Sequence, residues 1–234
     1  MLAKTWCIVG IVMVLTVGCG KKPEPVPSAP LPQMKPAPAT PIDEKRAEIG
    51  GAMWNPEWDK IVEEALPPEM LSAEMGKDLR QFCPQFNAIG EADKRAFWAY
   101  FFQALAGAEA GLKPTSRALH TQPEMEKKNG VPGQTEGLLQ LTYVDAKRYD
   151  CDFDWEADRT LKAGDPGRTI LQPKNNLECG IKILEKQIVD EHKPLLSRSG
   201  YWETLRPGTP GYRVFAKQMA NVPPACGVRA RRPR

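Results

Sequence analysis

Residues 91–111, EADKRAFWAYFFQALAGAEAG, carry the most regular apolar pattern in the chain. Phe97, Phe101 and Leu105 recur at intervals of four, the spacing that places side chains on one face of an α-helix. We therefore expect a helix over residues 91–107 with its aromatic face turned toward the protein core. The pattern therefore predicts a fold whose core is formed by packed α-helices.

One further step of four along the same face reaches Glu109, just before Gly111. Burial disfavours a charged carboxylate, so an acid on an apolar face can stay protonated near neutral pH and donate a proton. Alternatively, the helix has ended and Glu109 faces water. Periodicity leaves both interpretations open.

The rest of the chain also reads as helical, and we expect a mostly α fold. Asn55-Pro56-Glu57 has the residues of a helix start, with a capping side chain followed by proline in the first turn. No convincing alternating strand or Asn-Gly hairpin appears. The other expected helices cover residues 72–82, 136–149, 176–192 and 207–220.

The N-terminus is typical of an export signal. Residues 1–18 hold a short apolar run. At their end, Thr16-Val17-Gly18 together with the following Cys19 resembles a bacterial lipobox. We expect Cys19 to be lipidated, and Gly20 after it favours the outer membrane. An ordinary cleaved signal that leaves Cys19 free is the alternative.

Residues 19–47 are expected to form a tether behind this anchor. Eight prolines lie between residues 21 and 41, so the segment favours an extended polyproline spacer of roughly 60 Å. Residues 48–234 then make one domain. The composition, with 41% hydrophobic residues and a net charge of +3, argues against a multi-span membrane protein and gives no sign of a nucleic-acid partner.

Four cysteines remain in the expected domain: Cys83, Cys151, Cys179 and Cys226. An even number in an oxidising compartment predicts two disulfides, with three pairings possible. Their long spacings and the isolated histidines argue against zinc, and no metal or other cofactor is expected. Disulfide formation also argues against a cysteine nucleophile.

The order of several short motifs resembles the soluble lytic transglycosylase family, which has a lysozyme-like fold. The motifs are AEAGLKP at 108–114, GLLQL at 137–141, QP at 172–173 and NLECG at 176–180, within a region of resemblance over residues 97–188. In that family a catalytic glutamate ends a buried helix. A Gly-Leu-Met-Gln segment and an Asp-Pro…Asn-Ile-x-x-Gly helix start follow it.

The resemblance implies that Glu109 is the acid/base of a peptidoglycan lytic transglycosylase. It would protonate the glycosidic oxygen after N-acetylmuramic acid and then deprotonate that sugar's C6 hydroxyl, giving a 1,6-anhydro product. One carboxyl group suffices because the N-acetyl group of the substrate assists. Asp145 and Asp150 stay open as a second acid.

The same resemblance implies the substrate-binding residues. Gln140 would line the glycan cleft, while Gly137 and Leu138 would let the backbone approach the sugar. Tyr143 is expected to contact substrate or to pack in the core. The family's Ala-Tyr-Asn-Ala-Gly segment is absent, and Tyr201 is the candidate substitute for its tyrosine, with core packing as its alternative. A solvent-facing helix position is the alternative for Gln140.

Three other positions bear on the resemblance. Ala110 replaces the family's usual serine after the glutamate, and Leu139 replaces methionine with little change of volume. Asn176 is interpreted as a helix cap rather than a ligand group.

The resemblance favours a Cys151–Cys179 disulfide, which leaves Cys83 with Cys226. The expected partners are peptidoglycan glycan strands and, through the lipid, a membrane. Two other functions remain open: a lysozyme-type hydrolase that uses Glu109, and a glycan-binding or scaffold lipoprotein with an inactive site.

Overall fold

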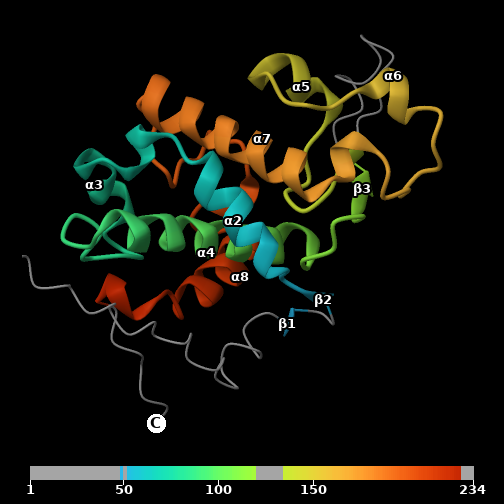
Figure 1. Ribbon diagram of the computed structural model, residues 1–234. Helices are drawn as coiled ribbons and strands as arrows, with labels where there is room; N and C mark the ends of the chain where they lie inside the picture. Colours follow the sequence, from blue (N-terminus) through green and yellow to red (C-terminus); the bar gives the residue numbers. More distant parts are fainter. Residues whose placement is uncertain (1–47, 50–51, 120–133, 228–234) are drawn as a thin grey trace, which may run out of the picture. The chain divides into compact units, whose positions relative to one another are not determined.

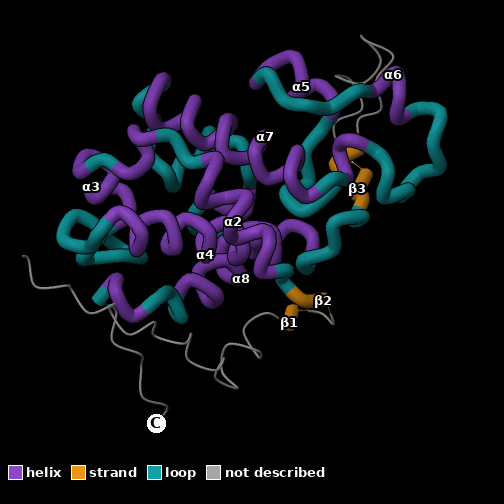
Figure 2. The backbone as a smooth tube through the Cα atoms, viewed as in Figure 1, coloured by secondary structure: helices purple, strands orange, loops and turns teal. Residues whose placement is uncertain are grey.

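The computed structural model describes residues 48–49, 52–119 and 134–227. This part of the chain is mostly helical (Figures 1 and 2). The signal peptide, Cys19 and the whole tether are predictions that lie outside the described residues. Within the described ranges, no helix is both long enough and apolar enough to cross a membrane.

Helix α4, Glu91–Ala110, is the central element, and its prediction from the aromatic spacing is confirmed. Phe97, Phe101 and Leu105 are fully buried. The helix continues one turn beyond the expected end because Gly111 adopts a left-handed conformation with φ of 57° and closes it. Glu109 therefore belongs to the last turn.

Helix α2, Pro56–Ala65, begins as its sequence predicts and packs against α4. The Asn55 side chain accepts a hydrogen bond of 2.9 Å from the Glu57 backbone N–H, which caps the helix. The buried side chains of Trp58 and Val62 form its inner face. This helix covers one side of α4 and shields its aromatic residues from water.

Helix α7, Pro173–Glu185, packs against α2 and continues as a π-helical turn, Lys186–Asp190. It begins three residues before the expected start at residue 176. The reason is that Pro173 takes the first helical position, where its missing N–H leaves no helical hydrogen bond unmade. Asn176 therefore lies inside the helix, and its interpretation as a cap is wrong.

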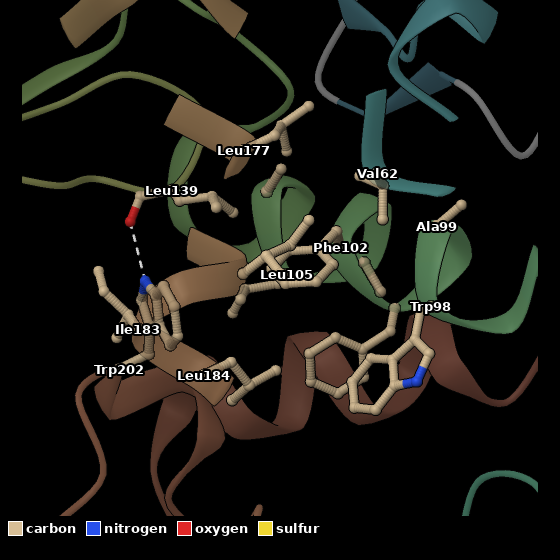
Figure 3. Close-up of a cluster of buried hydrophobic side chains, with 14 of the residues drawn as sticks. Val62, Trp98, Ala99, Phe102, Leu105, Leu139, Leu177, Ile183, Leu184 and Trp202 are labelled. Atoms are coloured by element: carbon tan, nitrogen blue, oxygen red, sulfur yellow. Dashed lines mark hydrogen bonds between the residues drawn. The ribbon is translucent and has the colours of Figure 1, made fainter. Parts of the chain in front are cut away.

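The core surrounds α4, and Figure 3 shows part of it. Helix α8, Pro210–Met219, closes the side that includes Phe101, whose ring centre is 5.1 Å from that of Phe215. The Trp202 indole Nε1 donates a 2.9 Å hydrogen bond to the Leu139 carbonyl, drawn as the dashed line in Figure 3. This bond ties the segment before α8 to the segment before α5.

The helix expected over residues 72–82 is much shorter in the structure. It consists of the 3-10 turn η2, Ala73–Met75, and the single-turn helix α3, Gly76–Leu79, after the 3-10 turn η1, Pro68–Leu71. After Leu79 the chain leaves the helix in a turn, where the N–H groups of Phe82 and Cys83 both donate to the Leu79 carbonyl at 2.8 Å.

The helix expected over residues 136–149 is wrong in its first half. Strand β3, Arg117–Leu119, pairs antiparallel with β4, Gln134–Glu136, and helix α5 covers only Tyr143–Tyr149. Gly137 has φ of 83° and Gln140 has φ of 50°, and neither angle is compatible with a right-handed helix. No convincing strand was apparent in the sequence, yet the described residues hold this short pair and a second one, in which β1, Glu48–Ile49, pairs with β2, Ala52–Met53.

Shorter elements complete the domain: α6, Trp155–Asp158; η3, Thr169–Leu171; η5, Glu203–Leu205; and η6, Pro224–Cys226. Both predicted disulfides are present. Cys151 pairs with Cys179 across a Cα–Cα distance of 5.1 Å, which links the end of α5 to α7. Cys83 pairs with Cys226 across 4.4 Å and holds η6 against the region after α3.

Candidate active site

Glu109 is partly buried in the last turn of α4 and accepts a hydrogen bond from the Thr204 side chain. Burial raises the pKa of its carboxyl group, the Thr204 bond opposes that rise, and the negative charge of Glu203 adds to it. The helix C-terminus also carries partial negative charge, which disfavours a carboxylate. These effects favour a protonated Glu109, as an acid catalyst requires.

Thr204 reaches Glu109 from η5, a short turn held on both sides. Trp202 anchors the turn through its bond to Leu139, and Leu205 is buried beside it. Gly211 of α8 permits close packing, since a Cβ there would lie 2.8 Å from the Thr204 Oγ1 atom. The adjacent Glu203 side chain is exposed. Two side chains of this turn thus act on Glu109: the buried Thr204 hydroxyl through a hydrogen bond and the exposed Glu203 carboxyl group through its charge.

Tyr201 lies on the same segment, three residues before Thr204. Its hydroxyl donates a 2.5 Å hydrogen bond to Asp145 Oδ2. Its ring meets those of Tyr149 and Trp202, with ring-centre distances of 6.1 and 4.8 Å. Burial raises the pKa of Tyr201 well above its usual range, and the negative charges of Asp145 and Glu109 add to this shift. Tyr201 is therefore a neutral phenol.

Asp145 is the buried one of the two acids that the sequence left open. It lies in the first turn of α5, where its Oδ2 atom accepts hydrogen bonds from Thr142 N at 2.8 Å and Thr142 Oγ1 at 2.9 Å. Burial raises the pKa of Asp145, and the bond from Tyr201 opposes this rise. Asp150, by contrast, is a fully exposed residue at the end of α5.

Gln140 is buried, so its solvent-facing alternative is wrong. Its Oε1 accepts a 3.0 Å hydrogen bond from Thr135 Oγ1, and its Nε2 donates to the Gly137 carbonyl at 2.8 Å and to the Ser116 carbonyl at 3.3 Å. Leu138 is fully buried. These contacts give the segment a role in the fold, and its contact with glycan stays a prediction.

Asn176 fixes the same segment from α7. Its Oδ1 accepts a 2.8 Å hydrogen bond from the Leu139 N–H, and its Nδ2 donates to the carbonyls of Glu136 and Ile170 at 3.2 and 3.0 Å. Gly137 is required for this packing, since a Cβ there would lie 2.2 Å from Asn176 Nδ2. Asn176 thus positions the fold, although not as a cap.

Tyr143 has the surroundings of a core residue. Its buried hydroxyl donates a 2.7 Å hydrogen bond to Asp158 Oδ2 and accepts a 2.8 Å bond from Arg168. The Trp155 ring packs against it with 5.1 Å between ring centres. Burial raises the pKa of Tyr143. Of its two sequence interpretations, the core position fits these contacts.

Sequence reasoning missed a buried ionic group behind this tyrosine. Glu136 is 0% exposed and forms an ion pair with Arg168, which is 3% exposed. Arg117 lies 3.5 Å from the other Glu136 oxygen. No local pattern marks these residues because the buried partners are 32 positions apart. Among the described residues, no group of three or more His, Cys, Asp or Glu could hold a metal ion.

We expect Glu109→Gln to stabilise the protein increasingly as pH rises. The folded-state pKa of Glu109 is raised, so its contribution to stability is fully present below the unfolded-state pKa and is lost as pH rises through the folded-state pKa. Glutamine keeps the same shape without this loss. Urea unfolding of both proteins, from below the usual glutamate pKa up to neutral pH, measures their free energies of unfolding. The difference in favour of the glutamine variant should widen as pH rises. A difference that does not change with pH would contradict the raised pKa.

The fold and these contacts define a class: a mostly helical, disulfide-linked domain with a partly buried acid at the end of its central helix. No protein-family model matches the chain, and no curated protein matches its sequence. Solved structures of the Bdellovibrio protein DslA are similar in fold, namely wild-type form 2 and two variants in which glutamine replaces a glutamate.

The first two DslA structures align with a TM-score of 0.57 at 23% identity, over 73% of this chain and 91% of theirs. The third aligns with a TM-score of 0.56 at 23% identity, over 71% of this chain and 89% of that one. This likeness is one of fold.

Proposed function

We propose that this chain is a peptidoglycan lytic transglycosylase with a lysozyme-like domain. It cleaves the β-1,4 bond between N-acetylmuramic acid and N-acetylglucosamine and leaves a 1,6-anhydro end. The observation that carries the proposal is Glu109: an acid at the end of a buried helix, with a raised pKa and a hydrogen bond from Thr204. The proposed reaction comes from the resemblance of the surrounding motifs, in their order along the sequence, to those of lytic transglycosylases.

The proposed reaction uses Glu109 twice. Its carboxyl proton passes to the glycosidic oxygen as the bond from that oxygen to C1 of the muramic acid breaks, with assistance from the substrate's N-acetyl group. The C6 hydroxyl of the same sugar then attacks C1, and its proton returns to the Glu109 carboxylate. The ring closes, the enzyme is regenerated and no water is consumed.

The neighbours of Glu109 support this role electrostatically. Thr204 orients the carboxyl group, and burial favours its protonated form. Tyr201 takes the place of the tyrosine in the family's missing segment. Gln140 and the backbone at Gly137 and Leu138 stay proposed glycan contacts. Ala110 is buried and leaves the family's serine hydroxyl without a counterpart at its own position.

The proposed location rests on the sequence. A lipid on Cys19 holds the protein at an envelope membrane, with the outer membrane favoured, and the proline-rich segment gives the domain reach. Several acyl chains on one cysteine make such anchoring nearly permanent. Glycan strands near the membrane are then the proposed substrate.

A lysozyme-type hydrolase is the second candidate, and Glu203 is the observation that favours it. This exposed carboxyl group lies near enough to Glu109 for its charge to raise the pKa of that acid. A second carboxylate beside the acid is what most glycoside hydrolases use to activate water or to attack the sugar. With Glu203 as that second carboxylate, water rather than the C6 hydroxyl attacks C1 of the muramic acid, and the product carries a reducing end.

Mass spectrometry of digested murein tests the proposal. The wild-type protein should release fragments with anhydro ends, each lighter by one water than fragments with reducing ends, and Glu109→Gln should release few or none. Reducing ends would support the hydrolase instead. Equal digestion by both proteins would reject Glu109 as the acid, and glycan binding without digestion by either would favour the scaffold.

A further inference from the structure

The turn η5 packs against both α4 and α8, and hydrogen bonds fix it to the start of α8. The Thr209 hydroxyl shares its hydrogen between the carbonyls of Glu203 and Arg206, at 3.1 and 3.0 Å. The same oxygen accepts a 3.1 Å bond from the Tyr212 N–H and so caps α8. One side chain therefore joins the first turn of α8 to both ends of η5.

The closest approach of α8 to η5 is at Gly211, the second residue of α8. A Cβ atom there would lie 2.8 Å from Thr204 Oγ1 and 3.3 Å from Thr204 Cα, closer than atoms that are not bonded normally pack. Gly211 lies in a regular helical turn and has no positive φ angle. Its backbone would therefore accept another residue, and it is the position of Thr204 that requires glycine.

Thr204 is the side chain that this close approach positions. It is 5% exposed, and its hydroxyl donates a hydrogen bond to the Glu109 carboxyl group. A branched threonine side chain has few allowed rotamers, so the location of its backbone largely decides where its hydroxyl lies. A side chain at Gly211 would force the hydroxyl into another rotamer or push η5 away from α8. In both cases the hydroxyl leaves Glu109.

We propose that Gly211 is a positioning residue of the candidate site, whose missing side chain lets α8 hold the Thr204 hydroxyl against the Glu109 carboxyl group. Gly211 acts through Thr204. The inference rests on the proposed function for its catalytic meaning and on the contacts above for its geometry.

The bond from Thr204 matters most after Glu109 has given up its proton. A donor that points at a carboxylate stabilises the charged form, which is the form that then takes the proton of the C6 hydroxyl. The bond also restricts rotation of the carboxyl group, and an acid must be aligned with the oxygen that it protonates. Without the Thr204 hydroxyl, we expect Glu109 to hold its proton more tightly and to be less well aligned.

NMR titration of Glu109 in the full-length protein, with labelled glutamate side chains, tests the inference without any activity. Gly211→Ala should raise the Glu109 pKa by about one unit, a tenfold increase in proton affinity, because the carboxylate loses its donor. Thr204→Val keeps the branched shape without the hydroxyl and should raise that pKa equally. The two changes together should raise it no further, whereas Thr204→Ser, which keeps a hydroxyl, should leave it as in the wild type.

An unchanged Glu109 pKa in either Gly211→Ala or Thr204→Val overturns the inference, and so does a further rise in the double variant. Alanine is a better helix former than glycine, so the change does not weaken α8 itself. If Gly211→Ala nevertheless fails to fold, adding Thr204→Ala removes the crowded Oγ1 atom and should restore folding. A double variant that still does not fold would overturn the inference, because the clash would then lie elsewhere.

Gly76→Ala is the control for general loosening of the structure. A Cβ at Gly76 would lie 2.2 Å from Asn87 Oδ1, so this variant creates a similar clash with a polar side chain in another part of the domain. It should lose thermal stability and keep the Glu109 pKa. A rise of that pKa as large as in Gly211→Ala would show an unspecific effect and overturn the inference.

The charge of Glu203 needs its own control, because Glu203 lies beside Thr204 and also acts on Glu109. Tyr201 is the other titratable group coupled to Glu109, and it is a neutral phenol over this pH range. In a Glu203→Gln background, Gly211→Ala should raise the Glu109 pKa by the same amount. If the rise vanishes there, the displaced charge of Glu203 accounts for it and the role of Thr204 is rejected.

Activity separates this inference from the proposed function. If murein is digested, Gly211→Ala should lower kcat by about 10–100-fold with little change in KM, since a small misplacement of an acid costs this much. The high-pH limb of the rate profile should move to higher pH along with the Glu109 pKa. A change in KM alone would overturn the catalytic meaning. If murein is not digested while the Glu109 pKa rises as expected, the proposed function fails and the positioning of Glu109 stands.

Discussion

Glu109→Gln is expected to lower the rate of murein cleavage by about 10²–10⁴-fold, the usual contribution of a positioned acid/base. The loss should appear in kcat, because glutamine has the same shape, can still accept the hydrogen bond from Thr204 and cannot supply a proton. Rates of anhydro-fragment release by purified proteins measure the effect. A fall of less than tenfold would show that another group is the acid.

Glu203→Gln is the matched control for this prediction, since it changes a neighbouring carboxyl group that is exposed. In the proposed reaction it should change the rate by less than about tenfold, because Glu203 acts only through its charge on Glu109. Removing that charge lowers the Glu109 pKa, so activity should be lost at a lower pH than in the wild type. A loss as large as that of Glu109→Gln would instead assign Glu203 the second carboxyl role of a hydrolase.

Most of α4 was predictable from the sequence because its helical spacing of apolar residues and their burial in the core have the same cause. Phe97, Phe101 and Leu105 are spaced for a helix and are all buried in one, so local pattern and tertiary packing agree. The same agreement holds for α2, where Asn55 and Pro56 start the helix as expected. The last turn, which carries Glu109, lies beyond the predicted end at residue 107 and is closed by the left-handed conformation of Gly111.

Prediction failed where the backbone leaves the right-handed helical region. Residues 136–149 contain enough apolar side chains for a helix, but the turn before α5 uses positive φ angles at Gly137 and Gln140. Glycine signals such a conformation, whereas glutamine does not. The buried amide of Asn176, 37 positions from the Leu139 N–H that it binds, stabilises this turn through contacts that no local window contains.

The partners of Glu109 were only partly predictable for the same reason. Tyr201 was proposed from its position in the chain, and the charge of Glu109 contributes to the raised pKa of its phenol. Thr204, three residues later, went unnoticed, because only the 3-10 turn η5 directs its hydroxyl to Glu109. The bond that Asp145 accepts from Tyr201 could not be foreseen, because the two residues are 56 positions apart.

Arg168→Ala is expected to destabilise the protein by about 3–5 kcal/mol, the usual cost of removing one partner from a buried ion pair. Glu136 is fully buried, and after the change only Arg117, at 3.5 Å and partly exposed, would oppose its charge. Tyr143 would also lose the hydrogen bond that it accepts from Arg168. Since a domain is stabilised by only about 5–15 kcal/mol, this is a large fraction of the total.

Urea unfolding with both disulfides intact measures this loss, and a double replacement separates the buried charge from packing. Glu136→Leu with Arg168→Met removes both charges, fills similar volume and leaves the bond between Tyr143 and Asp158 in place. It should recover most of the lost stability, because two well-packed apolar side chains often match a buried ion pair. If the double variant is as unstable as Arg168→Ala, the shape and hydrogen bonds of Arg168, rather than the unpaired charge of Glu136, account for the loss.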